Sequence, residues 1–398
     1  MSETSQRRTK GIYIAATGQH GGKTTVSLGL ISALARRGIS ASYMKPVGQR
    51  TIDVDGATVD PDAALMERIY GSIGDIALAS PVTVPSGMTR RFLEGRTTTQ
   101  ELQDRILAGY RHMGRHCDVV VLEGTGHAGV GSVLKLSNAR VASLVGAAAI
   151  IITGGGIGQP IDEFCLNKAL FDVDHVPVLG VIVNKLLPDK LSSVQPLLER
   201  GLAMHGTELL GAMPLWRQLT ELSLAEVLAK TGARLVSGEG PEAVHIRDVV
   251  IAGASPRRML EGVYERVLVI MPGSREDLAL AVLASWSPEC STGRMAGVCF
   301  TDGELPHEAI VSGLRRVGVP VIATHASTYD VAATVARMTA KTTAQDEAKI
   351  ELTKQLVERY VNVDRIAELL GLQGRAAAAP LCAVGQAGDP GPAPPQEP

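Results

Sequence analysis

One glycine-rich stretch, residues 11–25 (GIYIAATGQHGGKTT), constrains the fold of this chain more than any other. An apolar β-type run enters a turn that ends in Gly22-Lys23-Thr24, and a helical pattern follows at residues 26–36. Strand, glycine turn, Lys-Thr and helix, in this order, are typical of a phosphate-binding loop. Because a helix N-terminus carries unpaired N–H groups and partial positive charge, a glycine turn there can wrap around a phosphate.

The loop residues have expected roles. Lys23 would reach the outer phosphates of a nucleotide, and the Thr24 hydroxyl would hold Mg²⁺. The spacing departs from the usual pattern, because Thr17 stands at the first glycine position and Gly18 lies one place later. An ordinary glycine-rich turn is the alternative, but the flanking strand and helix favour nucleotide binding. The predicted nucleotide-binding residues of the loop are Thr17, Gly18, Gln19, His20, Gly21, Gly22, Lys23, Thr24 and Thr25.

Composition narrows the class of protein. A length of 398 residues predicts two domains, and a net charge of −2 with 3% aromatic residues argues against a nucleic-acid partner. The five cysteines are scattered and fit a reducing compartment. Residues 1–10 lack the apolar region of a signal peptide, and the longest apolar run, residues 145–152, is too short to span a membrane. We therefore expect a cytoplasmic protein without a membrane partner.

Charged residues follow two of the expected strands. Lys45 directly follows the strand at residues 40–44. Ligands bind at this end of the strands in open α/β sheets, although a solvated lysine is equally compatible with that position. Glu123 ends a fully apolar strand and is predicted to be the carboxylate near Mg²⁺, with a solvent-facing glutamate as the alternative. His127, four residues later, could contact a ligand or simply pack.

Repeated strand–helix spacing predicts the architecture of residues 10–235. Apolar runs at residues 147–152 and 178–183 read as buried strands, and the second ends in Asn184, whose amide suits a base edge. Alternation of this kind indicates an α/β fold with a doubly wound parallel sheet.

The order of these motifs resembles that of dethiobiotin synthetase and of the cobyrinic acid amide synthase group of ATPases. It is especially similar to the dethiobiotin-synthetase-like N-terminal module of long bacterial phosphate acetyltransferases. The resemblance covers about residues 10–235. The residues that carry it are Thr17–Thr25, Lys45-Pro46-Val47, Asp62-Ala63, Glu123-Gly124, the glycine cluster at residues 154–158, and Asn184.

This resemblance implies an ATP site with Mg²⁺ as its metal. It implies catalytic roles for Lys23, Lys45 and Glu123, a metal site formed by Thr24, Asp62 and Glu123, and adenine recognition by Asn184. Two acidic residues of the synthetase loop are replaced here by Gly18 and His20. We therefore expect nucleotide binding but not dethiobiotin synthesis.

The second half of the chain is predicted to form a separate, smaller α/β domain. Residues 232–244 contain glycines and predict the junction, and a new strand–helix alternation follows. The turn at residues 272–277 and the segment at 361–365 resemble the DRTGG domain, over about residues 240–370. No pair of nucleophile and base is visible there, which favours a binding or regulatory module. Residues 374–398, rich in Ala, Pro and Gly, are expected to be disordered.

Two functions remain open from the sequence. The first is an Mg–ATP-binding enzyme, a slow ATPase or a ligase-like enzyme acting on a small carboxylate, without acetyltransferase activity. The second is a nucleotide-sensing regulator that signals through the DRTGG-like domain to a metabolic partner. An amphipathic tract at residues 344–370 predicts either packing on its own domain or a dimer seam, and we expect a homodimer.

Overall fold

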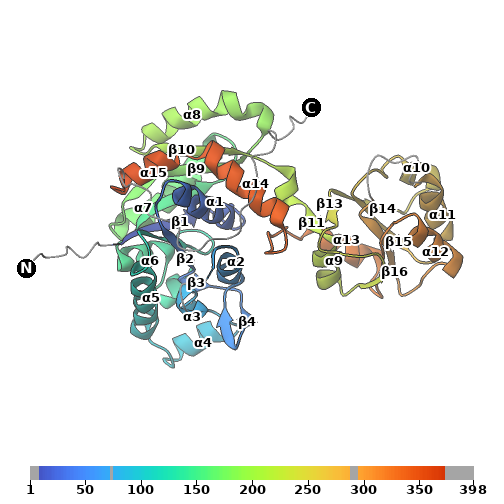
Figure 1. The fold of residues 1–398 in the computed structure, drawn as a ribbon, viewed down its shortest axis with the longest axis horizontal. Coiled ribbons are helices and arrows are strands. Elements are labelled where there is room, and N and C mark those ends of the chain that lie inside the picture. Colours follow the sequence, from blue (N-terminus) through green and yellow to red (C-terminus); the bar gives the residue numbers. More distant parts are fainter. Residues whose placement is uncertain (1–8, 72–74, 287–294, 373–398) are drawn as a thin grey trace, which may run out of the picture. The chain divides into compact units, whose positions relative to one another are not determined.

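The computed structural model describes residues 9–71, 75–286 and 295–372. The predicted disordered segment, residues 374–398, lies outside them. The chain divides into two compact units (Figure 1): one holds residues up to Met213 together with those from Lys354 onwards, and the other holds Pro214–Thr353. No helix among the described residues is long and apolar enough to cross a membrane.

The first unit is built on a six-stranded sheet with strand order β10-β9-β8-β1-β7-β2, and the pairings from β2 to β9 are parallel. Strand β7 is buried along its whole length and apolar up to its last residue, Glu123, as expected of a central strand covered on both faces. The predicted doubly wound parallel sheet is therefore confirmed. The strands are β1 Lys10–Ala16, β2 Ala41–Met44, β7 Val119–Glu123, β8 Ala148–Thr153, β9 Val178–Leu186 and β10 Leu209–Pro214.

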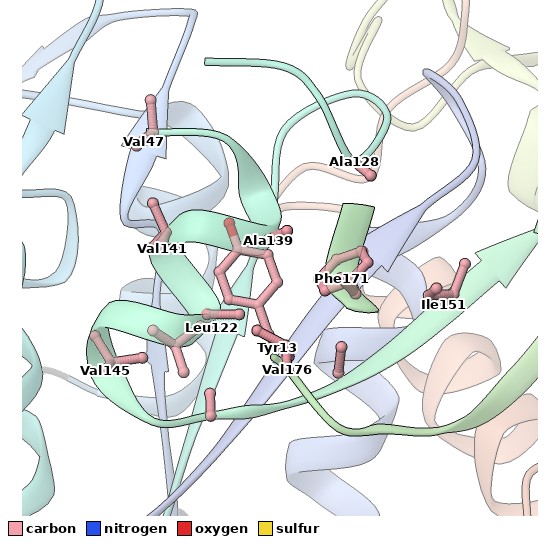
Figure 2. Close-up of a cluster of buried hydrophobic side chains, with 14 of the residues drawn as sticks. Tyr13, Val47, Leu122, Ala128, Ala139, Val141, Val145, Ile151, Phe171 and Val176 are labelled. Atoms are coloured by element: carbon pink, nitrogen blue, oxygen red, sulfur yellow. The ribbon is translucent and has the colours of Figure 1, made fainter. Parts of the chain in front are cut away.

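Helices cover both faces of this sheet. Tyr13 of β1 packs into the cluster of buried side chains that includes Val141 of α6 and Phe171 of α7 (Figure 2). Its neighbours Ile12 and Ile14 point to the opposite face and are fully buried as well. The helices of this unit are α1 Lys23–Arg36, α2 Pro61–Tyr70, α3 Ile76–Ala79, α4 Met88–Leu93, α5 Thr99–Gly114, α6 Asn138–Val145, α7 Gly158–Val173 and α8 Leu191–Ala203, with the short strands β3 Val47–Gly48, β4 Ile52–Val54, β5 Ala57–Val59 and β6 Val82–Thr83.

The C-terminal described residues return to the first unit. Helix α14 (Glu347–Tyr360) spans the division at Lys354, and α15 (Val363–Leu369) packs against α1. Arg37 at the end of α1 pairs with Glu358 and Asp364, and Gly211 of β10 forms a β-bridge with Val361. The predicted domain of residues 240–370 therefore differs from the structure, in which the last part of that range packs with the first unit.

The second unit has a five-stranded sheet with order β12-β17-β16-β15-β14, parallel except for β12. Strand β12 lies inside residues 232–244, which the sequence suggested as a junction, so that segment belongs to the sheet instead. The elements of this unit are β11 Leu222–Ser223, α9 Leu224–Thr231, β12 Arg234–Ser237, β13 His245–Ile246, β14 Asp248–Ile251, α10 Pro256–Leu260, β15 Val267–Pro272, α11 Glu276–Ser285, β16 Gly297–Thr301, α12 Glu308–Arg316, β17 Val321–Ala323 and α13 Thr328–Ala336.

Candidate functional site

The glycine turn joins β1 to the N-terminus of α1. Its last residue, Gly22, has φ 96° and precedes the helix without any side-chain cap, and the first turn of α1 contains no acidic residue. A side chain at position 22 would be strained at that φ and would place its Cβ 2.1 Å from Nδ2 of Asn184. The N-terminus of α1 is therefore left open to an anion, as the sequence predicts.

Lys23, the first residue of α1, lies inside the turn. Its Nζ donates hydrogen bonds to the carbonyl oxygens of Gly18 and Gly126, both at 3.2 Å. Burial lowers the pKa of this lysine to about 8, although Glu123 opposes the shift. A phosphate that replaced the two carbonyls would supply the negative charge that this buried ammonium group lacks.

Lys45, Asp62 and Glu123 converge beside the loop. The Nζ of Lys45 lies 2.8 Å from Oε1 of Glu123 and 2.9 Å from Oδ2 of Asp62. Thr24 donates to the same Oε1 of Glu123 at 3.0 Å. Strands β2 and β7 bring the lysine and the glutamate together because both end at the carboxyl edge of the parallel sheet, and α2 supplies the aspartate. Lys45 is 4% and Glu123 1% exposed, so neither residue is the solvated strand-end residue considered as an alternative.

The charges of this cluster fix the protonation of Lys45. Burial lowers the pKa of Lys45, but the carboxylates of Glu123, Asp62 and Asp60 together raise it by more. The resulting pKa lies above the usual value for lysine. Lys45 is therefore cationic, in contrast to Lys23, whose nearest partners are neutral carbonyls. The site thus holds one firmly charged lysine and one whose proton is held less tightly.

The aspartates before α2 have separate roles. Asp60 is the N-cap of α2 and accepts a hydrogen bond from the Asp62 N–H at 2.9 Å. Burial raises the pKa of Asp60 to about 6, while Lys45 opposes the shift. Asp62 projects to Lys45 instead. The direction of the two side chains therefore distinguishes the helix cap, Asp60, from the candidate metal ligand, Asp62.

Asn184 at the end of β9 contacts the glycine turn itself. Its Nδ2 donates to the carbonyl of Gly21 at 3.0 Å, and its Oδ1 accepts the N–H of Lys185 at 2.9 Å. The side chain is buried, with 6% of the residue exposed. Its role as an adenine reader remains a prediction.

The remaining predicted loop residues differ in their exposure. Gln19 and His20 are exposed, and His20 has φ 57°. Gly18, Gly21 and Thr25 are half-buried. Thr17 donates to Oε2 of Glu163 on α7 at 2.8 Å.

His127, left open by the sequence, is exposed in the loop after β7. Its Nδ1 accepts the N–H of Gly129 at 3.2 Å, so in this structure the side chain closes its own turn.

Two residues of the site have no signal in the sequence. Tyr43 donates its hydroxyl to Oε2 of Glu123 at 3.0 Å, and burial, followed by the charge of Glu123, raises its pKa well above the usual value. Asn138 donates to the carbonyls of Thr125 and His127 and accepts from the Tyr13 hydroxyl. Asn138 therefore fixes the loop after Glu123. Neither residue belongs to a motif, because each acts through a partner that only the fold brings near.

The side chains that could bind a metal suit a metal ion that is bound together with a nucleotide. Across the described residues, no group of three or more His, Cys, Asp or Glu side chains could hold a metal ion. Mg²⁺ bound with a nucleotide needs only one or two carboxylates, because phosphates and water complete its coordination. Thr24, Asp62 and Glu123 supply a hydroxyl and two carboxylates around Lys45, and this set fits such a complex.

Comparison with solved structures gives only weak similarities. The MinD cell division protein of Aquifex aeolicus is 15% identical, covers 53% of this chain and 84% of its own, and has a TM-score of 0.34. The CBS and DRTGG domains of the regulatory region of Clostridium perfringens pyrophosphatase, complexed with the activator diadenosine tetraphosphate, are 18% identical, with a TM-score of 0.24. That match covers 28% of this chain and 45% of the other.

Sequence relatives are phosphate acetyltransferases. The Nitrosomonas europaea protein is 24% identical over 369 residues, which are 90% of this chain and 51% of the relative. The Escherichia coli K12 protein is 22% identical over 397 residues, covering 92% of this chain and 53% of the relative. The chain spans about half the length of these relatives and is homologous to their N-terminal part.

Two family models match consecutive parts of the chain. The model described as DRTGG domain matches residues 226–338, which lie in the second unit. The model described as AAA domain matches residues 10–223, more than half of the 398 residues, and includes the glycine turn, Lys45, Asp62, Glu123 and Asn184. By this match the chain belongs to the AAA domain family, as a P-loop module fused to a DRTGG domain.

Proposed function

We propose that this protein binds Mg–ATP at the glycine turn and transfers the terminal phosphoryl group, either to water as a slow ATPase or to a small carboxylate as a ligase-like enzyme. The observation that carries the proposal is the buried contact of Lys45 with Glu123 and Asp62, next to Thr24 and the uncapped N-terminus of α1. An ordinary surface salt bridge does not need to be buried. A site that stabilises charge on a transferred phosphoryl group does, because fixed charges act more strongly where water is excluded.

Each residue has a distinct task in this proposal. Lys23 and the backbone N–H groups at the start of α1 bind the outer phosphates. Lys45 stabilises the charge that develops on the transferred group, and its raised pKa keeps it cationic. Thr24, Asp62 and Glu123 would hold Mg²⁺, which neutralises phosphate charge when bound. Tyr43 keeps Glu123 oriented through its hydroxyl.

The alternative function is regulatory. The P-loop module and the DRTGG domain lie on one chain, at residues 10–223 and 226–338, an arrangement that fits a nucleotide sensor acting on a metabolic partner. We also propose that these residues do not transfer acetyl groups, since the charged groups of the site are those of a nucleotide site. A homodimer and a cytoplasmic location remain expectations from the sequence.

Calorimetric titration with Mg–ATP tests the binding step. Replacing Lys23 by Ala should weaken binding roughly ten- to a hundredfold, because hydrogen bonds to charged groups contribute about 1.5–3 kcal/mol. Lys190→Ala, which removes an exposed lysine outside the site, should leave the affinity unchanged. Equal affinity in wild type and Lys23→Ala would show that the turn is not the phosphate site.

A further inference from the structure

Asn184 and Lys185, which precede the last residue of β9, donate hydrogen bonds to two consecutive carbonyl groups of the glycine turn. Asn184 donates from Nδ2 to the carbonyl of Gly21 at 3.0 Å, and Lys185 donates from Nζ to the carbonyl of His20 at 2.8 Å. The two donors are adjacent in sequence, and so are the two acceptors. We call Asn184 and Lys185, with these two hydrogen bonds, the loop clamp.

The loop clamp has a consequence for the N–H groups of the turn. In a trans peptide the N–H points opposite to the C=O of the same peptide plane. The carbonyls of His20 and Gly21 share their planes with the N–H groups of Gly21 and Gly22. Because both carbonyls bond to the end of β9, both N–H groups point away from it. Within the described part of the chain, neither N–H donates a hydrogen bond to a backbone carbonyl.

The orientation of the Asn184 amide is set by its surroundings. Its Oδ1 accepts the N–H of Lys185, which leaves Nδ2 as the atom that faces Gly21. The backbone is unusual on both sides of the contact, since His20 and Lys185 have φ of 57° and 63°. Such conformations are uncommon for residues other than glycine and persist where surrounding contacts hold them.

We propose that Asn184 and Lys185 are positioning residues for phosphate, which orient the N–H groups of Gly21 and Gly22 toward the anion. This inference rests on the proposed nucleotide binding and assigns a role that base recognition does not require. A residue that reads only the base affects ATP and not a ligand without a base. The loop clamp acts on the phosphate chain, so it affects both ligands equally.

The test compares two ligands by calorimetry in the presence of Mg²⁺: ATP and inorganic tripolyphosphate. Lys185→Met should weaken the binding of both by about the same factor, roughly tenfold, equal to about 1.4 kcal/mol. Lys185→Gln and Lys185→Arg keep an N–H donor and should retain most of the affinity for both ligands. Lys190→Met, at an exposed lysine outside the glycine turn, is the matched control and should behave as wild type.

The outcomes separate the inference from the proposed function. Wild-type affinity for both ligands in Lys185→Met would overturn the loop clamp while leaving nucleotide binding intact. Loss of ATP affinity alone, with tripolyphosphate unchanged, would assign these residues to the base instead. If Lys185→Gln and Lys185→Met weakened ligand binding equally, the charge of Lys185 and not its hydrogen bond would support binding. That result would also overturn the loop clamp. A wild-type protein that binds neither ligand would refute the proposed function itself.

Discussion

At the scale of single residues, the site is defined by the carboxylate of Glu123. One oxygen contacts Lys45 and Thr24, and the other accepts from Tyr43. The side chain is almost completely buried, and a buried charge is tolerated only when it is paired and hydrogen-bonded. A carboxylate held by three partners is fixed in position, and small displacements of a catalytic group are costly, about 10²-fold for 1 Å.

Replacing Glu123 by Gln should therefore affect turnover more than binding. We expect the affinity for Mg–ATP to stay within about tenfold, equal to about 1.4 kcal/mol, and phosphate release at saturating Mg–ATP to fall by about 10²-fold or more. Glu199→Gln, at an exposed position on α8, is the control. Wild-type phosphate release at the background without protein would exclude the enzyme and leave the nucleotide-sensing regulator.

At the scale of elements, α15 is the unexpected part of the first unit. Its residues Val363 and Ile366 are fully buried although they follow β10 by some 150 positions in the sequence. Gly211 permits the approach, because a Cβ at that position would meet the Tyr360 carbonyl oxygen at 2.7 Å. The amphipathic tract at residues 344–370, which contains α15, predicted a buried face but not which partner covers it.

Ile366→Ala should destabilise the first unit by about 2–5 kcal/mol, the usual effect of deleting a buried isoleucine side chain. Both tryptophans, Trp216 and Trp286, lie in the second unit. Denaturation followed by far-UV circular dichroism should thus show the loss, while the transition seen by tryptophan fluorescence stays in place. Leu166→Ala, at an exposed position, should change stability by less than about 0.5 kcal/mol. An unchanged dichroism midpoint in Ile366→Ala would contradict the packing of α15.

At the scale of the whole molecule, the first unit is discontinuous. The chain leaves it after Met213, forms the second unit, and returns at Lys354. The second unit therefore begins earlier and ends earlier than the sequence suggested, since β11, α9 and β12 precede residue 240. Strand β12 completes one edge of its sheet by pairing with β17, and α9 packs on α13.

Two fragments distinguish these boundaries. The fragment of residues 214–353 should unfold cooperatively and hold its tryptophans in an apolar environment. The fragment of residues 240–370 lacks β12 and α9 and carries α15 without its partner α1, so it should be molten or aggregate. The measurement is denaturant unfolding of both purified fragments by fluorescence. Equal cooperativity in the two would favour the boundary predicted from the sequence.

Local sequence patterns determined much of the first unit. The apolar runs that end at Met44 and Glu123 predicted buried parallel strands, because a strand covered on both faces must be apolar throughout. The glycine turn with Lys23 and Thr24 predicted an open helix N-terminus, because this turn between a strand and a helix is typical of a phosphate-binding loop. In a parallel sheet the strand ends meet at one edge, so Lys45 and Glu123 could be expected near the loop.

The tertiary structure alone decided the rest, because the remaining contacts join residues that are far apart in sequence. Asp60 and Asp62 are the same residue type, two positions apart. Only the direction of each side chain makes Asp62 a partner of Lys45 and Asp60 a helix cap. Tyr43 bonds to Glu123, and Asn138 to Tyr13, through long-range hydrogen bonds that no local period encodes. The return of α15 depends on a buried surface offered by α1, which an amphipathic pattern can require but cannot identify.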